Sequence, residues 1–211
     1  MNVFLLSEGD GVVCFDTGSR EMATEVRRMA AALGGISRIV LSHGHADHRG
    51  AARGIGAPVW CHEDERIDVE ADAGQRYWRL GGPGLRRDLL RGQVMSALRD
   101  GGPVSVAGTV AEGDMVGQFV VIHLPGHAPG QIGLWRESDR TVLAGDCFHA
   151  IDDHTAGLPK EAFSQDMALA RESLLRIAAM EPVLAWAGHG PALRGDVRKM
   201  LERAACNDAH G

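Results

Sequence analysis

The sequence predicts a layered α/β fold, on the basis of three observations. Short apolar runs with the length of β-strands alternate with longer segments whose apolar residues recur at helical spacing. The 211 residues are 45% hydrophobic, which suffices to bury the core of one domain of ordinary size. No linker, low-complexity tract or short-period repeat divides the chain. We therefore expect one domain over residues 1–211, in which helices cover sheets.

The first part of the chain predicts strands on both sides of one helix. This helix is expected from Glu21 to Leu33, before the pair Gly34-Gly35. Its apolar residues recur at helical spacing: Met22, Val26, Met29, Ala30 and Leu33. Strands are expected at Asn2–Leu6, Val12–Phe15, Arg38–Ser42 and Pro58–Cys61. The apolar face of the helix is expected to pack on this sheet.

The later part of the chain predicts a second set of strands followed by two helices. The strands are expected at Phe119–Leu124, Gln131–Trp135, Thr141–Gly145 and Val183–Ala187. The helices are expected at Ser164–Met180 and Gly195–Cys206. Their apolar faces consist of Leu174, Leu175, Ile177 and Ala178 in one helix, and of Val197, Met200, Leu201 and Ala204 in the other. Two sets of strands with helices outside them give a layered α/β architecture.

Three imidazoles and one carboxylate stand within six residues between Ser42 and Arg49. These residues are His43, His45, Asp47 and His48. Neutral imidazole and carboxylate suit zinc, iron or manganese. The spacing is too tight for the helical His pair of a zinc protease, and so dense a cluster is unexpected in a chain with only 10 His. The pattern predicts a metal-binding loop rather than a solvated polar loop.

Three further residues occur in similar settings later in the chain. His127, Asp146 and His189 each lie just past an apolar strand-like run, with Gly or Pro beside them. Loops at strand ends are where a rigid sheet presents functional side chains, and glycine permits the close backbone approach that ligands need. We expect these three residues to complete the metal site.

Taken in order, these residues resemble the motifs of the metallo-β-lactamase superfamily. The family's His-x-His-x-Asp-His motif corresponds to residues 43–48, and its later His, Asp and His correspond to His127, Asp146 and His189. Asp16 matches the family's first motif, an Asp that supports the metal loop through hydrogen bonds without binding metal. The resemblance spans positions 16–189. It implies a four-layer αββα sandwich of the metallo-β-lactamase type, with the metals at one edge.

What the resemblance implies for the metals is a dinuclear centre. The first ion would be held by His43, His45 and His127. The second ion would be held by Asp47, His48 and His189. Asp146 would bridge the two. Zinc is the expected metal, with iron or manganese as alternatives, because this ligand set does not choose strictly between them.

The activity implied is that of a metal-dependent hydrolase acting on an ester, thioester or lactone. Two ions about 3.5–4 Å apart share and acidify a water, and the bridging hydroxide would attack the carbonyl. Asp47 is the carboxylate best placed to hand a proton to the leaving group. The sequence contains no Gly-x-Ser-x-Gly motif and no Cys–His pair of recognised spacing, so no side-chain nucleophile is expected.

Several alternatives stay open. A true β-lactamase is disfavoured, because family members that open β-lactams usually lack an Asp at the position of Asp146. A persulfide dioxygenase-like oxidoreductase would hold one iron through His43, His45 and Asp146 or a nearby His. A non-catalytic relative would use the fold for binding. Two-domain glyoxalase II enzymes carry a C-terminal helical domain for which a chain ending at Gly211 has little room, so a short glyoxalase II-like thioesterase or a lactonase is the narrower expectation.

Residues 63–102 are the expected lid or specificity segment. The segment begins acidic and turns basic, with arginines at positions 76, 79, 86, 87, 91 and 99. An amphipathic helix is predicted by Leu85, Leu89, Leu90, Val94 and Leu98. The charges are expected to form a solvated face or to pair with one another. In the functional alternative, the arginines together with Tyr77 and Trp78 contact an anionic or aromatic substrate.

The composition narrows the expected partners and compartment. The net charge of −6 weighs against nucleic acid, because phosphate binding needs clustered Lys and Arg. The apolar stretch Met1 to Leu6 is too short for a signal peptide, and no run of 18 apolar residues exists. We therefore expect a cytoplasmic protein with a small-molecule substrate and without a membrane partner. The sequence does not predict an oligomeric state.

The remaining cysteines and histidines are expected to have structural roles. Cys14, Cys61, Cys147 and Cys206 form no Cys-x-x-Cys pair, so reduced thiols are expected. Cys147 adjoins Asp146 but is expected to be buried rather than to bind metal. The other histidines expected not to bind metal are His62, His149, His154 and His210. His123 is expected to be a hydrogen-bonded residue at the end of a strand.

Overall fold

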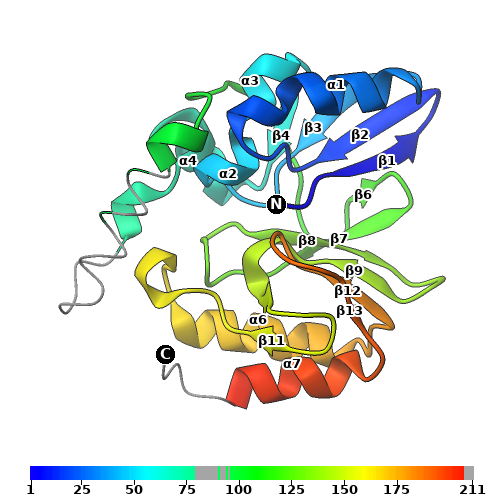
Figure 1. Cartoon of the computed structure of the whole chain (residues 1–211), viewed down its shortest axis with the longest axis vertical. Helices are drawn as coiled ribbons and strands as arrows, with labels where there is room; N and C mark the ends of the chain where they lie inside the picture. The colour runs from blue at the N-terminus through cyan, green and yellow to red at the C-terminus, as the bar shows by residue number, and fades with distance from the viewer. Residues whose placement is uncertain (79–89, 91–93, 95, 207–211) are drawn as a thin grey trace.

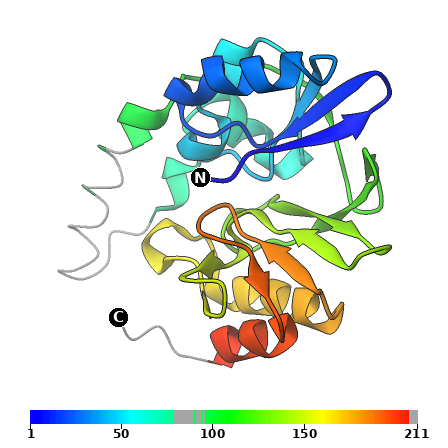
Figure 2. The same cartoon turned by 45° about the vertical axis from the view of Figure 1, so that its right-hand side comes forward.

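The computed structural model describes residues 1–78, 90, 94 and 96–206, and it contains two β-sheets that pack face to face. Helices cover the outer face of each sheet (Figure 1). The sequence of layers, helix, sheet, sheet and helix, is also clear in the rotated view of Figure 2. The predicted α/β, four-layer αββα sandwich is therefore confirmed.

The first sheet has five strands in the order β1-β2-β3-β4-β5. The strands are β1 (Phe4–Glu8), β2 (Gly11–Phe15), β3 (Ile36–Val40), β4 (Val59–Cys61) and β5 (Val106–Thr109). β1 pairs with β2 antiparallel, and β2 to β5 run parallel. The accompanying α-helices are α1 (Ala23–Ala31), α2 (Ala46–Arg49), α3 (Ala52–Ile55) and α4 (Arg66–Glu70). Three short 3-10 helices are η1 (Arg20–Met22), η2 (Glu63–Glu65) and η3 (Gln75–Tyr77).

The second sheet has six strands in the order β13-β12-β9-β8-β7-β6. The strands are β6 (Met115–Val116), β7 (Phe119–His123), β8 (Ile132–Arg136), β9 (Thr141–Leu143), β12 (Leu184–Trp186) and β13 (Leu193–Arg194). A separate pair is formed by β10 (His149–Ala150) and β11 (Ala156–Gly157). The helices are η4 (Gly145–Cys147), η5 (Glu161–Phe163), α6 (Met167–Ala179) and α7 (Val197–Cys206). The Asp166 side chain caps α6, which explains why this helix begins later than the expected Ser164.

Three apolar layers hold the sandwich together. Val13 and Phe15 of β2 pack between the sheets against strands β7, β8 and β9, whereas Cys14 of the same strand points toward the helices over the first sheet. A third layer lies between the second sheet and helices α6 and α7. β2 is buried on both faces for this reason, as its continuous apolar run indicates.

The helical faces are narrower than the sequence predicts. In α1, Val26 and Ala30 are buried, but Met29 is 54% exposed, and Leu33, which lies beyond the end of this helix, is 51% exposed. In α6, Leu175 is 45% exposed, although its neighbour Leu174 is fully buried. The assignment of these three residues to packed faces was therefore wrong, because a surface helix buries only the stripe that faces the sheet.

The segment from residue 63 to 102 is only partly within the described residues. Positions 90, 94 and 96–99 are helical, as expected. The described apolar side chains Leu90, Val94 and Leu98 are more than half exposed. The expectations for the following residues lie outside the described part of the chain: Arg79, Leu85, Arg86, Arg87, Leu89 and Arg91. The described charges form pairs, since Arg76 contacts Asp68 and Asp72.

The sheets bring the predicted functional residues to one edge. Asp16 follows β2 and His43 follows β3, and these two strands are parallel neighbours. Asp146 follows β9 and His189 follows β12, which are also parallel neighbours. Because parallel strands end at the same edge of a sheet, the loops that carry these residues converge.

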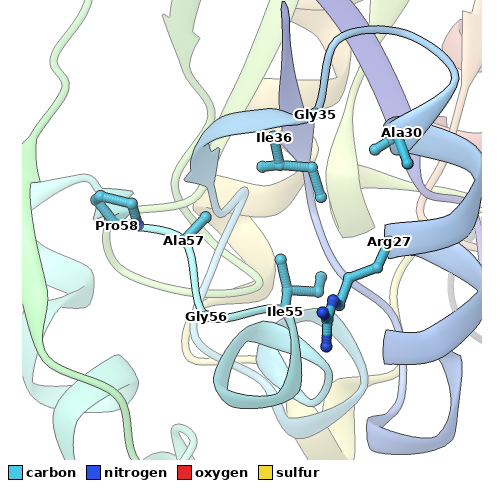
Figure 3. A pocket seen from close by; sticks show the side chains of 9 residues that line it. Arg27, Ala30, Gly35, Ile36, Ile55, Gly56, Ala57 and Pro58 are labelled. Atoms are coloured by element: carbon cyan, nitrogen blue, oxygen red, sulfur yellow. The ribbon is translucent and has the colours of Figure 1, made fainter.

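A cavity of about 390 Å³ lies away from this edge, on the helical side of the first sheet. Its lining includes Arg27 and Ala30 of α1, Ile36 of β3, and Ile55 and Pro58 (Figure 3). None of its lining residues is a predicted ligand. Within the described residues, no helix has the length and apolar character needed to cross a membrane.

Candidate metal centre

The seven side chains predicted to bind metal lie together at the edge where the two sheets meet. Ligand-type atoms fall within 4.8 Å of one another in three groups: His43, His45 and His127; His43, His48 and Asp146; and Asp47, His48 and His189. The first and third groups are the two ligand sets that the sequence implies. Asp146 lies between them, with its carboxylate oxygens 3.4 Å from His48 Nε2 and 3.7 Å from His189 Nε2.

His43 and His48 each bind a protein group through Nδ1. His43 Nδ1 lies 3.0 Å from Ser42 Oγ, and His48 Nδ1 lies 2.9 Å from Asp16 Oδ2. The Ser42 hydroxyl donates a hydrogen bond to Asp16 Oδ2 at 2.8 Å, so Ser42 Oγ accepts the hydrogen bond from the Nδ1–H group of His43. When neutral, both rings therefore carry their proton on Nδ1 and leave the lone pair of Nε2 free. This arrangement places Asp16 where it orients the loop.

His127 and His45 also bind an outside group through one ring nitrogen and leave the other nitrogen free of that contact. His127 Nδ1 lies 3.0 Å from Ser164 Oγ, which donates to the Lys160 carbonyl and therefore accepts from the ring. His45 Nε2 lies 3.0 Å from Tyr77 Oη. The remaining nitrogens, His45 Nδ1 and His127 Nε2, face each other at 3.0 Å. Each of the four buried rings thus turns one nitrogen toward a common centre.

The atoms at this centre are buried and lack partners within the described part of the chain. They are His43 Nε2, His48 Nε2 and Asp146 Oδ1. An unpaired buried polar atom costs about 1–3 kcal/mol, so such atoms are rarely left without a partner. A cation would satisfy all three atoms at once. The donor set, imidazole nitrogen and carboxylate oxygen, therefore fits a divalent metal.

The charges around the centre also favour a cation. Burial would lower the pKa of His48, but the carboxylates of Asp16 and Asp146 raise it well above its usual range. Burial would raise the pKa of Asp146, but His48 and His189 hold it well below its usual range. Burial lowers the pKa of His45 to about 4. In the metal-free protein, a proton on His48 thus supplies the positive charge that the carboxylates require.

Two glycines make room for these groups. A Cβ atom at Gly188 would overlap Asp146 Oδ1 and lie 2.7 Å from His48 Cε1, so the residue before His189 has to lack a side chain. Gly126, before His127, has a φ of 133° and packs against the backbone of Ala170 at the start of α6. Glycine adopts this conformation without the strain that a Cβ would cause.

Glu65 is a part of the site that the sequence did not reveal. The residue is fully buried in η2, and its two carboxylate oxygens accept the backbone N–H groups of Gly44 and Gly130, each at 2.7 Å. Gly44 stands between His43 and His45, and Gly130 follows His127. Glu65 therefore ties together the two loops that carry the first ligand set, and we call this pair of hydrogen bonds the Glu65 clamp. Burial raises the pKa of Glu65 to about 7, although both hydrogen bonds oppose the shift.

An aromatic wall formed by Tyr77, Trp78 and Phe163 borders the centre. The Trp78 ring lies 6.2 Å from the ring of His45 and meets Phe163 edge to face at 5.1 Å. Trp78 Nε1 is buried and has no hydrogen-bond partner among the described residues. Tyr77 and Trp78 were predicted to contact substrate, whereas Phe163, 85 residues further along the chain, carried no local signal.

Asp47 and Cys147 occupy different environments beside the centre. Asp47 is partly exposed, and its carboxylate lies 3.4 Å from His189 Nε2 and 3.0 Å from Arg99 Nη1. Cys147 is buried, and burial with the neighbouring Asp146 raises the pKa of its thiol. The four cysteines are free thiols, as expected. A neutral buried thiol is unreactive, and Cys147 belongs to none of the ligand groups that the described residues form.

Comparison with known proteins identifies the family. The model of the metallo-β-lactamase superfamily matches residues 2–189. This chain belongs to the metallo-β-lactamase superfamily. Two Bacillus subtilis (strain 168) proteins are similar to this superfamily member. Probable metallo-hydrolase YybB is 27% identical over 90% of this chain and 80% of its own length, and probable metallo-hydrolase YflN is 28% identical over 92% and 82%.

Other similar proteins extend the comparison of this superfamily member. Hydroxyacylglutathione hydrolase GloC of Haemophilus influenzae is 24% identical over 72% of this chain and 68% of its own length. The solved structure of metallo-beta-lactamase family protein TTHA1429 from Thermus thermophilus matches with a TM-score of 0.68 and 26% identity, covering 97% of this chain and 73% of that chain. TTHA1623, solved in a di-iron-bound form, matches with a TM-score of 0.70 and 22% identity over 96% and 92%. The similarity to TTHA1623 concerns the fold of this chain alone.

Proposed function

We propose that this superfamily member is a dinuclear metal-dependent hydrolase that cleaves an ester, thioester or lactone. The observation that carries the proposal is the orientation of the four buried imidazoles. Each binds an outside group through one nitrogen and turns the other nitrogen inward, around Asp146 Oδ1, which has no hydrogen-bond partner among the described residues. A binding module without metal has no reason to leave these atoms unsatisfied.

The two proposed ligand sets are the two groups of neighbouring ligand-type side chains described above. One ion would be held by His43, His45 and His127, and the other by Asp47, His48 and His189. Asp146 would bridge them, since it approaches histidines of both sets. Zinc is proposed, with iron or manganese as alternatives. When bound, two such ions acidify a water and polarise the carbonyl of the substrate.

Asp47 is the residue to which we assign proton transfer. Burial would raise the pKa of Asp47, but the hydrogen bond with His189 and the nearby His48 lower it. Asp47 therefore enters the reaction ionised, so it first accepts a proton from the attacking water and then donates this proton to the leaving group. Arg99 lies 3.0 Å from the carboxylate and favours its ionised form.

The aromatic wall supports a carbonyl substrate with an apolar or aromatic part. Tyr77 Oη accepts a hydrogen bond from the Nε2–H group of His45, so its own O–H remains available to donate to substrate. Trp78 Nε1 is a second donor without a partner among the described residues. Trp78 and Phe163 offer apolar surface beside these donors. The similarity to GloC supports a thioester within this class.

Metal analysis combined with a substrate panel tests the proposal. The purified protein should contain about two divalent ions per chain and hydrolyse an ester, thioester or lactone in preference to a β-lactam. Asp146→Asn should lose metal and activity together. Asp139→Asn is the matched control, because Asp139 pairs with Arg136 on an exposed turn. One iron per chain with oxygen uptake on a persulfide would overturn the hydrolase assignment in favour of the dioxygenase alternative.

A further inference from the structure

A second group of metal-type ligands lies outside the centre, beside η2. His62, Asp64 and His123 each place one ligand atom within 4.8 Å of the others. His62 follows β4 of the first sheet, and His123 is the last residue of β7 in the second sheet. Both histidines were expected not to bind metal, and their meeting depends entirely on the packing of the two halves. We propose that this group is a further site for a divalent transition metal such as zinc, which we call the His62 site.

The hydrogen bonds around the His62 site leave suitable lone pairs. His123 Nε2 lies 3.1 Å from the Pro129 carbonyl, to which it donates, so its Nδ1 carries the free lone pair. His62 Nδ1 accepts only a long bond, 3.3 Å, from the Asp64 backbone N–H. Zinc binds the neutral form of an imidazole ring, through a nitrogen that carries no proton.

The distance between His62 Nδ1 and the Asp64 carboxylate is close to the distance between two ligand atoms on one metal ion. His62 Nδ1 lies 3.6 Å from Asp64 Oδ2. Two ligand atoms on one tetrahedral zinc stand about 3.4 Å apart, given bonds of about 2.1 Å. The two imidazoles are stacked, with centroids 4.4 Å apart and planes 8° from parallel. Binding therefore requires the His62 ring to rotate about Cβ–Cγ and give up its long bond from the Asp64 N–H, while His123 keeps its bond to the Pro129 carbonyl. Both lone pairs can then converge beside the carboxylate.

The surroundings of the His62 site admit an ion and connect it to the fold. The Asp64 side chain is 60% exposed, which leaves open positions for water on the ion. Gly130 packs so closely beneath the site that a Cβ there would lie 2.8 Å from His62 Nδ1. An ion would therefore link η2 to the end of β7, across the same junction as the Glu65 clamp. Ligands from both halves are separated on unfolding, so binding should stabilise the folded protein.

His154 offers a matched control for the His62 site. Its Nε2 lies 3.6 Å from Asp153 Oδ2, which equals the His62–Asp64 distance, but no second imidazole is grouped with it among the described residues. A His–Asp pair alone should bind zinc weakly. The comparison of the two pairs isolates the contribution of His123.

The test compares bound zinc and thermal stability in the full chain. Wild type and the variants His62→Gln, His123→Gln, Asp64→Asn and His154→Gln are each saturated with zinc, freed of unbound ion and analysed for zinc content. We expect wild type and His154→Gln to retain one more zinc per chain than the other three variants. Excess zinc should also raise the Tm of wild type and His154→Gln by more than that of the three variants.

Asp64→Asn keeps the test decisive if a histidine variant fails to fold, because the Asp64 side chain is largely exposed and its replacement leaves the packing of the core unchanged. Equal zinc content in wild type and Asp64→Asn would overturn the proposal. An equal loss in His154→Gln would also overturn it, since binding would then reflect scattered surface histidines.

Discussion

Replacing Glu65 by glutamine tests how the two ligand-bearing loops are held in register. The carboxylate accepts one N–H from the loop of residues 43–48 and one from the loop that follows His127. Glutamine has nearly the same size, but one of its two terminal groups is an amide NH2, which cannot accept a hydrogen bond. Glu65→Gln therefore leaves one loop without its acceptor while the packing around the side chain stays nearly unchanged.

The magnitude follows from the buried N–H that loses its partner. Such a group costs about 1–3 kcal/mol. If the lost hydrogen bond destabilises the metal-binding arrangement of the first ligand set by this amount, metal affinity should fall by about 5- to 150-fold. The conversion is that about 1.4 kcal/mol corresponds to a factor of ten. The unfolding free energy of the metal-free protein should fall by a smaller amount at neutral pH, because the variant also removes a buried charge.

The pH dependence of the unfolding free energy tests the role of Glu65 independently. The folded pKa of Glu65, about 7, lies above the ordinary value of 4.5. Its contribution to stability is therefore fully present below pH 4.5 and is lost as the pH rises through 7. A shift of this size corresponds to at most about 3–4 kcal/mol. Between about pH 5 and pH 8, metal-free wild type should lose stability relative to Glu65→Gln, which does not titrate at this position.

Urea unfolding of the metal-free proteins at pH 5 and pH 8, together with metal competition against a chelator, measures both effects. Glu63→Gln is the control, because Glu63 lies in the same 3-10 helix but its side chain is 66% exposed and pairs with Arg66. Its stability should change by less than about 0.5 kcal/mol. The reasoning is refuted if Glu65→Gln retains metal with wild-type affinity and shows the same pH dependence as wild type.

Three further predictions concern the metal centre. Asp146→Asn should lower metal content and reduce turnover by orders of magnitude, whereas Asp16→Ala should have a milder effect. Elemental analysis and turnover rates measure both effects. Full activity of Asp146→Asn would show that Asp146 does not bridge the two ions. Tyr77→Phe removes the acceptor for His45 Nε2 and should weaken metal binding by about 10- to 100-fold in chelator competition, and unchanged affinity would contradict this role. Because the metal-free protein holds a proton on His48, metal affinity should rise with pH as this proton is lost. Titration calorimetry of metal binding in two buffers at pH 7 should detect the released proton. Binding without proton release would contradict a protonated His48.

The fold class and the residues that meet at the centre could be predicted from local sequence patterns. Ligand identity is local information, since three imidazoles and a carboxylate within six residues have few roles other than metal binding. His127, Asp146 and His189 were identifiable because each follows a buried strand beside Gly or Pro. The alternation of strands and helices predicted the layers, but periodicity did not distinguish the buried stripe of α1 from Met29 at its margin.

The groups that orient these ligands could not be predicted, because they come from segments that meet only when the chain folds. Glu65 and Gly130 are 65 residues apart, and His127 and Ser164 are 37 residues apart, so no local pattern relates them. The same holds for His62 and His123, which come from different sheets. A hydrogen bond or a shared ion depends on separations of a few tenths of an ångström between atoms of distant segments. Such distances are set by how the two sheets pack, and composition and spacing along the chain carry no record of them.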